Sequence, residues 1–187
     1  ILIDDQAINY YIYEGSFTDD ARHGTGTLTR TDGYVYDGDW RDGIMQGQGR
    51  ETFPDGTVYE GRFVDGLAEG RGTITYPEGA SYTGDWVEGT MQGMGVMSYP
   101  DGSVYEGEVA NGRQEGQGIL THPNGYRYEG TWEDGVPHGQ GTITYADGAV
   151  YEGAFAAGQP EGQGTLTAPD GFTYAGSWDD GQMTGTG

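Results

Sequence analysis

The feature that most constrains this chain is a strict repeat of 23 residues. A tyrosine begins each unit, and these are Tyr13, Tyr36, Tyr59, Tyr82, Tyr105, Tyr128, Tyr151 and Tyr174. Self-similarity at a fixed period of roughly 20 to 50 residues is typical of repeat architectures, in which each unit packs mainly on its neighbours. We therefore expect eight tandem units over residues 13–187, the last one incomplete. Residues 1–12 are expected to be an N-terminal cap or the remnant of a preceding unit.

Side-chain alternation within one unit predicts a pair of strands. A strand over residues 58–64 places Tyr59, Gly61 and Phe63 on one face, because successive side chains point to opposite faces. After a predicted loop over residues 65–70, the alternation resumes in a second strand. Asp-Gly and Pro-Asp-Gly sequences supply the turns, and glycine recurs too often for a helix. The predicted fold class is all-β: an elongated, single-layer, twisted antiparallel sheet of tandem β-hairpins, shaped as a rod or trough.

Glycines between the aromatic residues indicate how such a sheet keeps one face dry. A glycine leaves a bare strip of backbone on which a neighbouring aromatic ring can lie. The predicted structural core of the repeats comprises Tyr36, Gly38, Trp40, Tyr59, Gly61, Phe63, Tyr82, Gly84, Trp86, Tyr128, Gly130 and Trp132. Tryptophan alternates with a smaller residue along this row, which either a packing requirement or duplication of a two-repeat ancestor explains.

Two other sets of side chains are predicted as an interaction surface. Met45, Met91 and Met183 share one position, assigned here to the hairpin loop, where flexible thioethers serve either an adaptable contact or packing between loops. Tyr34, Tyr126 and Phe172 follow the turns of odd-numbered units and are expected to fill the space beside the smaller rings.

The charge balance excludes several classes of function. The chain has 30 Asp and Glu against 8 arginines and no lysine, for a formal net charge of −22. Binding to nucleic acid draws its affinity from Lys and Arg, so no nucleic-acid partner is expected. Cysteine is absent, which excludes disulfides and thiol chemistry. No apolar run approaches the ~18 residues of a membrane-spanning helix. Because the sequence begins with Ile1 and ends with Gly187, we expect it to be part of a longer chain.

Neither catalytic nor metal-binding residues are predicted. Catalysis needs groups that converge within hydrogen-bonding reach, and His23, His122 and His138 lie in different, mostly distant units. Acidic residues follow the repeat tyrosine in six units, at Glu14, Asp37, Glu60, Glu106, Glu129 and Glu152. Two strands per unit would separate them by about 10 Å, too far for a shared ion. We therefore expect a non-enzymatic chain without cofactor or metal.

The combined pattern resembles the MORN (membrane occupation and recognition nexus) repeat. It consists of Tyr-Glu-Gly-x-Trp/Phe-x-Asp-Gly, then Gly-x-Gly, then Pro-Asp-Gly, and it extends over residues 13–187. The resemblance implies hairpin units in an elongated single sheet. It also implies an association with scaffolding, dimerisation, membrane junctions, phosphoinositide kinases or a histone lysine methyltransferase. The lysines that commonly suit MORN loops to anionic lipid are missing here.

The sequence thus favours a scaffold that binds protein partners through an acidic and aromatic surface. Open sheet edges invite pairing, so we also expect self-association, as a homodimer or end to end. One alternative is an accessory or targeting domain of a larger enzyme or envelope protein. Others are peripheral binding to phospholipid, which the net charge disfavours, and capture of a small ligand or peptide on the aromatic rings. The partner and the compartment are not predicted.

Overall fold

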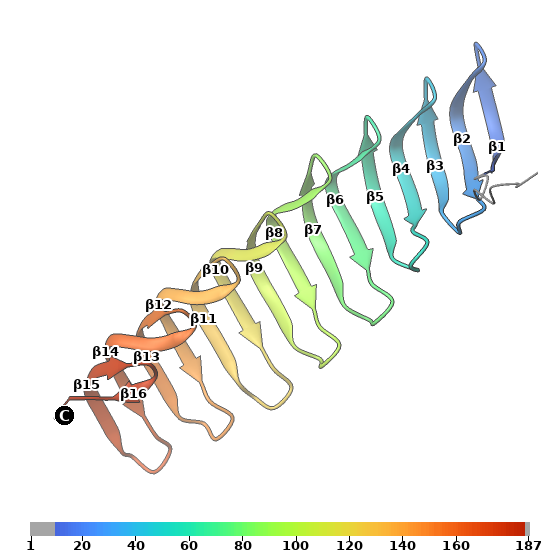
Figure 1. Ribbon diagram of the computed structural model, residues 1–187. Coiled ribbons are helices and arrows are strands. Elements are labelled where there is room, and N and C mark those ends of the chain that lie inside the picture. The colour runs from blue at the N-terminus through green and yellow to red at the C-terminus, as the bar shows by residue number, and fades with distance from the viewer. Residues whose placement is uncertain (1–9, 186–187) are drawn as a thin grey trace, which may run out of the picture. The chain divides into compact units, whose positions relative to one another are not determined.

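The computed structural model describes residues 10–185, which form strands and turns without a helix. Sixteen strands make one antiparallel sheet in chain order, and the order is not closed because β1 and β16 stand at its ends (Figure 1). The strands are β1 (Tyr11–Thr18), β2 (Ala21–Arg30), β3 (Val35–Arg41), β4 (Ile44–Thr52), β5 (Val58–Val64), β6 (Leu67–Thr75), β7 (Ser81–Val87), β8 (Thr90–Ser98), β9 (Val104–Ala110), β10 (Arg113–Thr121), β11 (Arg127–Glu133), β12 (Val136–Thr144), β13 (Val150–Ala156), β14 (Gln159–Thr167), β15 (Thr173–Asp179) and β16 (Gln182–Met183). The all-β prediction is confirmed. No helix in the described range is long and apolar enough to span a membrane.

The chain divides into two compact units. The first unit reaches to Ser81 and also includes Trp86–Gly89, and the second includes Tyr82–Asp85 and the chain from Thr90 onward. Both units are built from the same hairpin, so the local geometry of one can be compared directly with that of the other.

The hairpin turn is tighter than the sequence suggested. Strands β5 and β6 are joined by Asp65 and Gly66 alone, whose φ angles are 50° and 83°. Positive φ at both central residues fits a type I′ turn, the connection whose twist matches two antiparallel strands. The predicted loop over residues 65–70 was therefore wrong. Strand β6 begins directly after the turn, and Gly70, with a φ of 71°, lies where the pairing register shifts by a bulge.

Each repeat tyrosine lies over a pair of glycines on neighbouring strands. Tyr36 is fully buried, and a Cβ added at Gly38 or Gly49 would come within 2.7 or 2.5 Å of its hydroxyl oxygen. Its ring meets those of Trp40 and Phe63 edge to face, with centroids 5.0 and 5.1 Å apart. Glycine is required at these positions because any side chain would displace the ring.

The second unit repeats this packing. The ring of Tyr128 contacts Trp132 and Phe155 edge to face at centroid distances of 5.1 and 5.0 Å. The side chains of the row are buried in both units: Tyr36, Trp40, Tyr59, Phe63, Tyr82, Trp86, Tyr128 and Trp132. Under these tyrosines lie Gly38, Gly61, Gly84 and Gly130. We call this row the buried ladder. In it the repeat tyrosines alternate with the aromatic rings that stand four residues after each tyrosine. Val109 interrupts it, as the sequence indicated.

The polar atoms of the buried ladder are paired with backbone. Every repeat tyrosine donates its hydroxyl to the carbonyl three residues further on, at 2.6–3.1 Å. The four indole N–H groups donate to glycine carbonyls at 2.8–3.2 Å. Burial raises the pKa of Tyr59 and of Tyr128 to about 12, so these phenols remain protonated donors at neutral pH.

Candidate functional site

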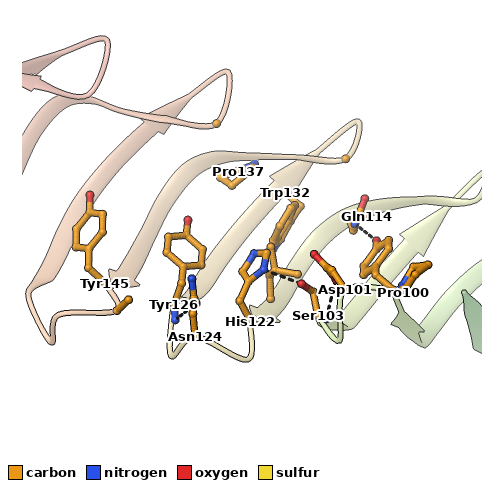
Figure 2. A pocket seen from close by; sticks show the side chains of 15 residues that line it. Pro100, Asp101, Ser103, Gln114, His122, Asn124, Tyr126, Trp132, Pro137 and Tyr145 are labelled. Atoms are coloured by element: carbon orange, nitrogen blue, oxygen red, sulfur yellow. Dashed lines mark hydrogen bonds between the residues drawn. The ribbon is translucent and has the colours of Figure 1, made fainter.

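A second aromatic row lies beside the buried ladder in the second unit. Tyr99, His122 and Tyr145 recur every 23 residues near the ends of β8, β10 and β12, and Tyr126 precedes β11. The rings of His122 and Tyr126 have centroids 5.2 Å apart, and those of Tyr126 and Tyr145 are 6.3 Å apart. Figure 2 shows Tyr126 and Tyr145 side by side with their hydroxyls pointing the same way. All four rings are partly exposed.

These rings line a pocket of about 960 Å³, which we call the Tyr126 pocket. Trp132, which is 3% exposed, and Leu120 also border it, as do Pro137 and Asp101. Most of the lining is therefore flat aromatic, prolyl or aliphatic surface, with few polar atoms. Pockets of this composition typically bind apolar groups and orient them with a small number of hydrogen bonds.

Hydrogen bonds fix the rings on one side of the pocket. The Ser103 hydroxyl lies 2.6 Å from His122 Nδ1, and Gln114 Nε2 donates to the Tyr99 hydroxyl at 2.6 Å (Figure 2). The Ser103 amide donates to Asp101 at 2.8 Å. Hydrogen bonding from the side chain and then the backbone of Ser103 holds the pKa of Asp101 below its usual value. The pocket walls are thus positioned before any ligand arrives.

The Ser103–His122 pair resembles a nucleophile and base, but its burial argues for a structural role. Ser103 is only 2% exposed, so its hydroxyl has little access to a substrate. The acid beside it, Asp101, accepts from the Ser103 amide, and the imidazole is hydrogen-bonded to the Ser103 hydroxyl instead. In a catalytic triad the acid instead orients the imidazole. The pair therefore orients the His122 ring against Tyr126.

Two hydroxyls in the pocket lack a hydrogen-bond partner within residues 10–185. Among the described residues, neither Tyr126 Oη nor Tyr145 Oη makes a hydrogen bond. Burial raises the pKa of both phenols, and each is raised further by a neighbouring titratable group. Both groups are therefore protonated donors that face the pocket without an acceptor.

In the first unit, four repeats earlier, the tyrosine equivalent to Tyr126 is contacted by side chains of its own unit. Tyr34 corresponds to Tyr126, and its hydroxyl donates to Glu51 Oε1 at 2.7 Å. The same hydroxyl lies 3.6 Å from Met45 Sδ, and the Arg30 guanidinium carbon lies 5.2 Å from the Tyr34 ring centroid. At the three equivalent positions of the second unit stand His122, Pro137 and Ile143.

The structure distributes the predicted surface residues differently from the prediction. The assignment of Met45, Met91 and Met183 to a hairpin loop was wrong: they lie in β4, β8 and β16, because the two-residue turn lets each strand begin earlier. Tyr34 packs against the Phe53 ring at 6.2 Å, and Tyr126 lines its pocket. Phe172 is 52% exposed.

Sequence reasoning missed the second row itself. Phe53, Tyr76, Tyr99, His122 and Tyr145 recur at the repeat period, which was the available signal. Of these residues, only His122 enters the sequence analysis, as one of three histidines in different units. The pocket forms because Tyr126, which follows a turn, lies beside His122 and Tyr145 at the ends of strands. That arrangement depends on the geometry of the hairpins, which the spacing of the residues alone does not define.

Within the part of the chain that the structure describes, one group of acidic side chains meets the distance requirement for a metal site. Glu161, Asp179 and Asp180 bring carboxylate oxygens within 4.8 Å of one another. The Asp180 amide donates to Glu161 Oε2 at 3.1 Å, just as the Asp134 amide donates to Glu115 Oε2 at 3.1 Å one hairpin pair earlier. Glu161 therefore accepts a hydrogen bond from the turn of the next hairpin, as Glu115 does two repeats earlier.

Comparison with known proteins agrees with the repeat. The model of the family described as MORN repeat matches residues 13–33, 36–58, 59–81, 82–104, 105–125, 128–150, 151–173 and 174–187. No curated protein matches the chain. Among solved structures, the SAS-4 (dCPAP) TCP domain of Drosophila melanogaster, in complex with a proline-rich motif of Ana2 (dSTIL), is similar with a TM-score of 0.51 and 16% identity over 87% of this chain and 88% of that chain. A mutant TCP10 domain of Danio rerio CPAP has a TM-score of 0.49 and 18% identity over 87% and 76% of the two chains. The similarity to the SAS-4 domain concerns the fold.

Proposed function

Since the chain belongs to the MORN repeat family, we propose that it is a non-enzymatic scaffold that binds protein partners through the second aromatic row, which includes His122, Tyr126 and Tyr145. The observation that carries the proposal is the Tyr126 pocket, where ordered rings and unpaired hydroxyls remain accessible. A fold with side chains presented by rigid strands suits binding, because little conformational entropy is lost on association. The SAS-4 TCP domain, solved with a proline-rich motif, supports a protein-binding use of a similar sheet.

Site-specific photocrosslinking tests this function. A photoreactive phenylalanine is placed at Tyr126, and in a matched variant at Glu129, an exposed residue of β11 next to the buried Tyr128. Side chains of Tyr128 and Glu129 point to opposite faces of the strand. In extract of the source organism, discrete protein adducts are expected from the first variant and not from the second. Equal adducts from both faces, or none from either, would contradict the proposal.

Self-association is a second candidate, which the exposed apolar side chains of β1 favour. Tyr11, Ile12 and Phe17 are 69%, 65% and 58% exposed, and β1 stands at an end of the strand order. Such an edge can pair with another strand. We expect the mass measured by light scattering to rise with protein concentration. The Ile12→Lys variant should have a lower mass than the wild type at the same concentration. A monomer mass at all concentrations would exclude this candidate.

Peripheral lipid binding has less support from the charges. Several arginines of the first unit already pair with acids: Arg30 with Asp32, and Arg50 with Glu60 at 2.8 Å. An anionic membrane attracts basic residues by about 1 kcal/mol each, and here acids outnumber them. Vesicles rich in phosphatidylserine are therefore expected not to sediment the protein, even at low salt.

A further inference from the structure

We infer that the Tyr126 pocket binds an extended, proline-containing segment of a partner protein that carries basic residues beside its prolines. The inference rests on the proposed function, since it specifies the partner of the same site. It goes further by committing to one pocket, one backbone conformation and one charge. Three independent features of the second unit support it.

The first feature is the shape of the lining. Tyr126, Tyr145 and His122 present ring faces and edges in a row, and Pro137 adds another flat surface. Proline-rich segments adopt the polyproline II conformation before they bind, so they lose little entropy when they dock on aromatic-lined grooves. The pyrrolidine ring is a compact apolar group that fits between such faces.

The second feature is the balance of donors and acceptors. The hydroxyls of Tyr126 and Tyr145 are free to donate, whereas the Tyr99 hydroxyl accepts from Gln114 and donates to Met97 Sδ at 3.5 Å. A polyproline II segment has carbonyls without internal partners, and its prolines have no N–H. The two unpaired hydroxyl donors therefore match the carbonyls of a proline segment, whereas an ordinary strand would also bring amides that need acceptors.

The third feature is charge. The second unit holds 14 Asp and Glu and 2 arginines, a net charge of 2 − 14 = −12. Both arginines are already paired, Arg113 with Asp134 at 3.2 Å and Arg127 with Glu129 at 2.7 Å. Asp101 borders the pocket itself. This negative field attracts a basic segment and repels an acidic one. The residues beside the prolines are therefore expected to be basic.

The first unit suggests a variant that would obstruct the pocket. There Met45 and Glu51 contact the Tyr34 hydroxyl, and their counterparts Pro137 and Ile143 make no hydrogen bond to Tyr126 Oη. Replacing Pro137 by methionine restores the first unit's side chain at the wall of the pocket. Pro137→Met is thus a blocking variant designed from the protein's own sequence.

Binding of synthetic peptides to the full chain tests the inference by calorimetry. The probe is a peptide of four Pro-Pro-Arg triplets, and its controls are an Ala-Ala-Arg peptide and a Pro-Pro-Gln peptide of equal length. We expect both controls to bind at least about tenfold more weakly than the probe, since each lacks one recognition element. The affinity for the probe should also fall with added salt.

Variants locate the site. The double variant Tyr126→Phe/Tyr145→Phe keeps both rings and removes both donors, so a loss of about tenfold is expected, and Pro137→Met should weaken binding similarly. Tyr34→Phe removes the equivalent hydroxyl in the first unit and should leave the affinity unchanged. Thermal unfolding confirms that each variant folds. If the double hydroxyl variant does not fold, Pro137→Met alone decides the location.

Three results would overturn the inference: no binding of the probe at low salt, equal binding of the probe and the Ala-Ala-Arg peptide, or unchanged binding by Pro137→Met and the double variant. The proposed function survives such a result if Tyr126 still crosslinks to partner proteins. It fails separately if the crosslinks are absent while the peptide binds, because the pocket would then have no protein partner in the extract.

Discussion

The surroundings of Tyr34 and Tyr126 show how one repeat serves two purposes. The two residues occupy equivalent positions four repeats apart, and each packs against a ring of the following unit, Phe53 or Tyr145. Around Tyr34 the protein satisfies its own hydroxyl with Glu51. Around Tyr126 the equivalent hydroxyl has no partner in residues 10–185, and a pocket opens. The difference lies in a few side chains, since the backbone hairpin is the same.

The contrast separates residues that specify the fold from residues that specify binding. The buried ladder and its glycines are alike in both units, with ring spacings near 5 Å in each. Side chains after the turns differ from repeat to repeat, as at Thr57, Ser103 and Tyr126, whereas the strand ends mostly keep an aromatic ring. Repeat proteins can therefore change their binding surface without altering the interactions that hold neighbouring units together.

The largest expected effect tests whether the ladder is equally demanding in both units. Gly49→Ala and Gly141→Ala would each place a Cβ 2.5–2.8 Å from atoms of Tyr36 or Tyr128. Because the ring must move, we expect each variant to lose about 3 kcal/mol of unfolding free energy, measured by urea denaturation. Gly43→Ala is the control, since a Cβ there meets nothing within 4 Å and only its φ of 82° is unfavourable. A clearly smaller loss of unfolding free energy for Gly141→Ala than for Gly49→Ala would show that the second unit packs more loosely.

Next in size is the cation beside the ladder, which the first unit has and the second lacks. The Arg22 guanidinium carbon lies 4.2 Å from the Trp40 ring centroid, and Gln114 is the equivalent residue beside Trp132. We expect Arg22→Gln to lower the unfolding free energy by about 1 kcal/mol and Gln114→Arg to raise it by less. A double-mutant cycle of Arg22 with Trp40→Phe isolates the pair. Coupling near zero would mean that the Arg22 hydrogen bond to the Gly43 carbonyl carries the effect.

The sequence predicted the ladder well and the pocket poorly, for a physical reason. Tyr36, Gly38 and Trp40 are constrained at one repeated position each, so alternation on a strand is enough to place them together. The Tyr126 pocket joins a residue after a turn with the strand ends of three hairpins, and the Tyr126 hydroxyl is left without an acceptor because Ile143 stands where the first unit has Glu51. The misplaced loop over residues 65–70 had the same origin, because glycine marks a bulge as readily as a turn.

The third expected effect concerns Glu51, the acid that accepts a hydrogen bond from the Tyr34 hydroxyl in the first unit. Burial raises the pKa of Glu51, although the hydrogen bond from Tyr34 acts in the opposite direction. A raised pKa in the folded state means that the carboxyl's contribution to stability is complete below its unfolded pKa and is lost as the pH rises through the folded pKa. Glu51→Gln does not titrate, so its stability relative to wild type should increase with pH across the acidic range. Parallel pH profiles of the two unfolding midpoints would contradict this.

The smallest expected effect lies in the turns, where the two units differ by one residue. Asp65 and Ala157 are equivalent, and both adopt a left-handed conformation with φ of 50° and 49°. Aspartate tolerates this region better than alanine, because its short polar side chain can hydrogen-bond locally. We expect Ala157→Asp to gain about 0.5 kcal/mol of unfolding free energy and Asp65→Ala to lose about as much, measured by urea denaturation. If only Asp65→Ala has an effect, the cause lies in the surroundings of the Asp65 side chain and not in the backbone angle that both turns share, since the variant keeps the hydrogen bond from the residue 65 amide to Gln46.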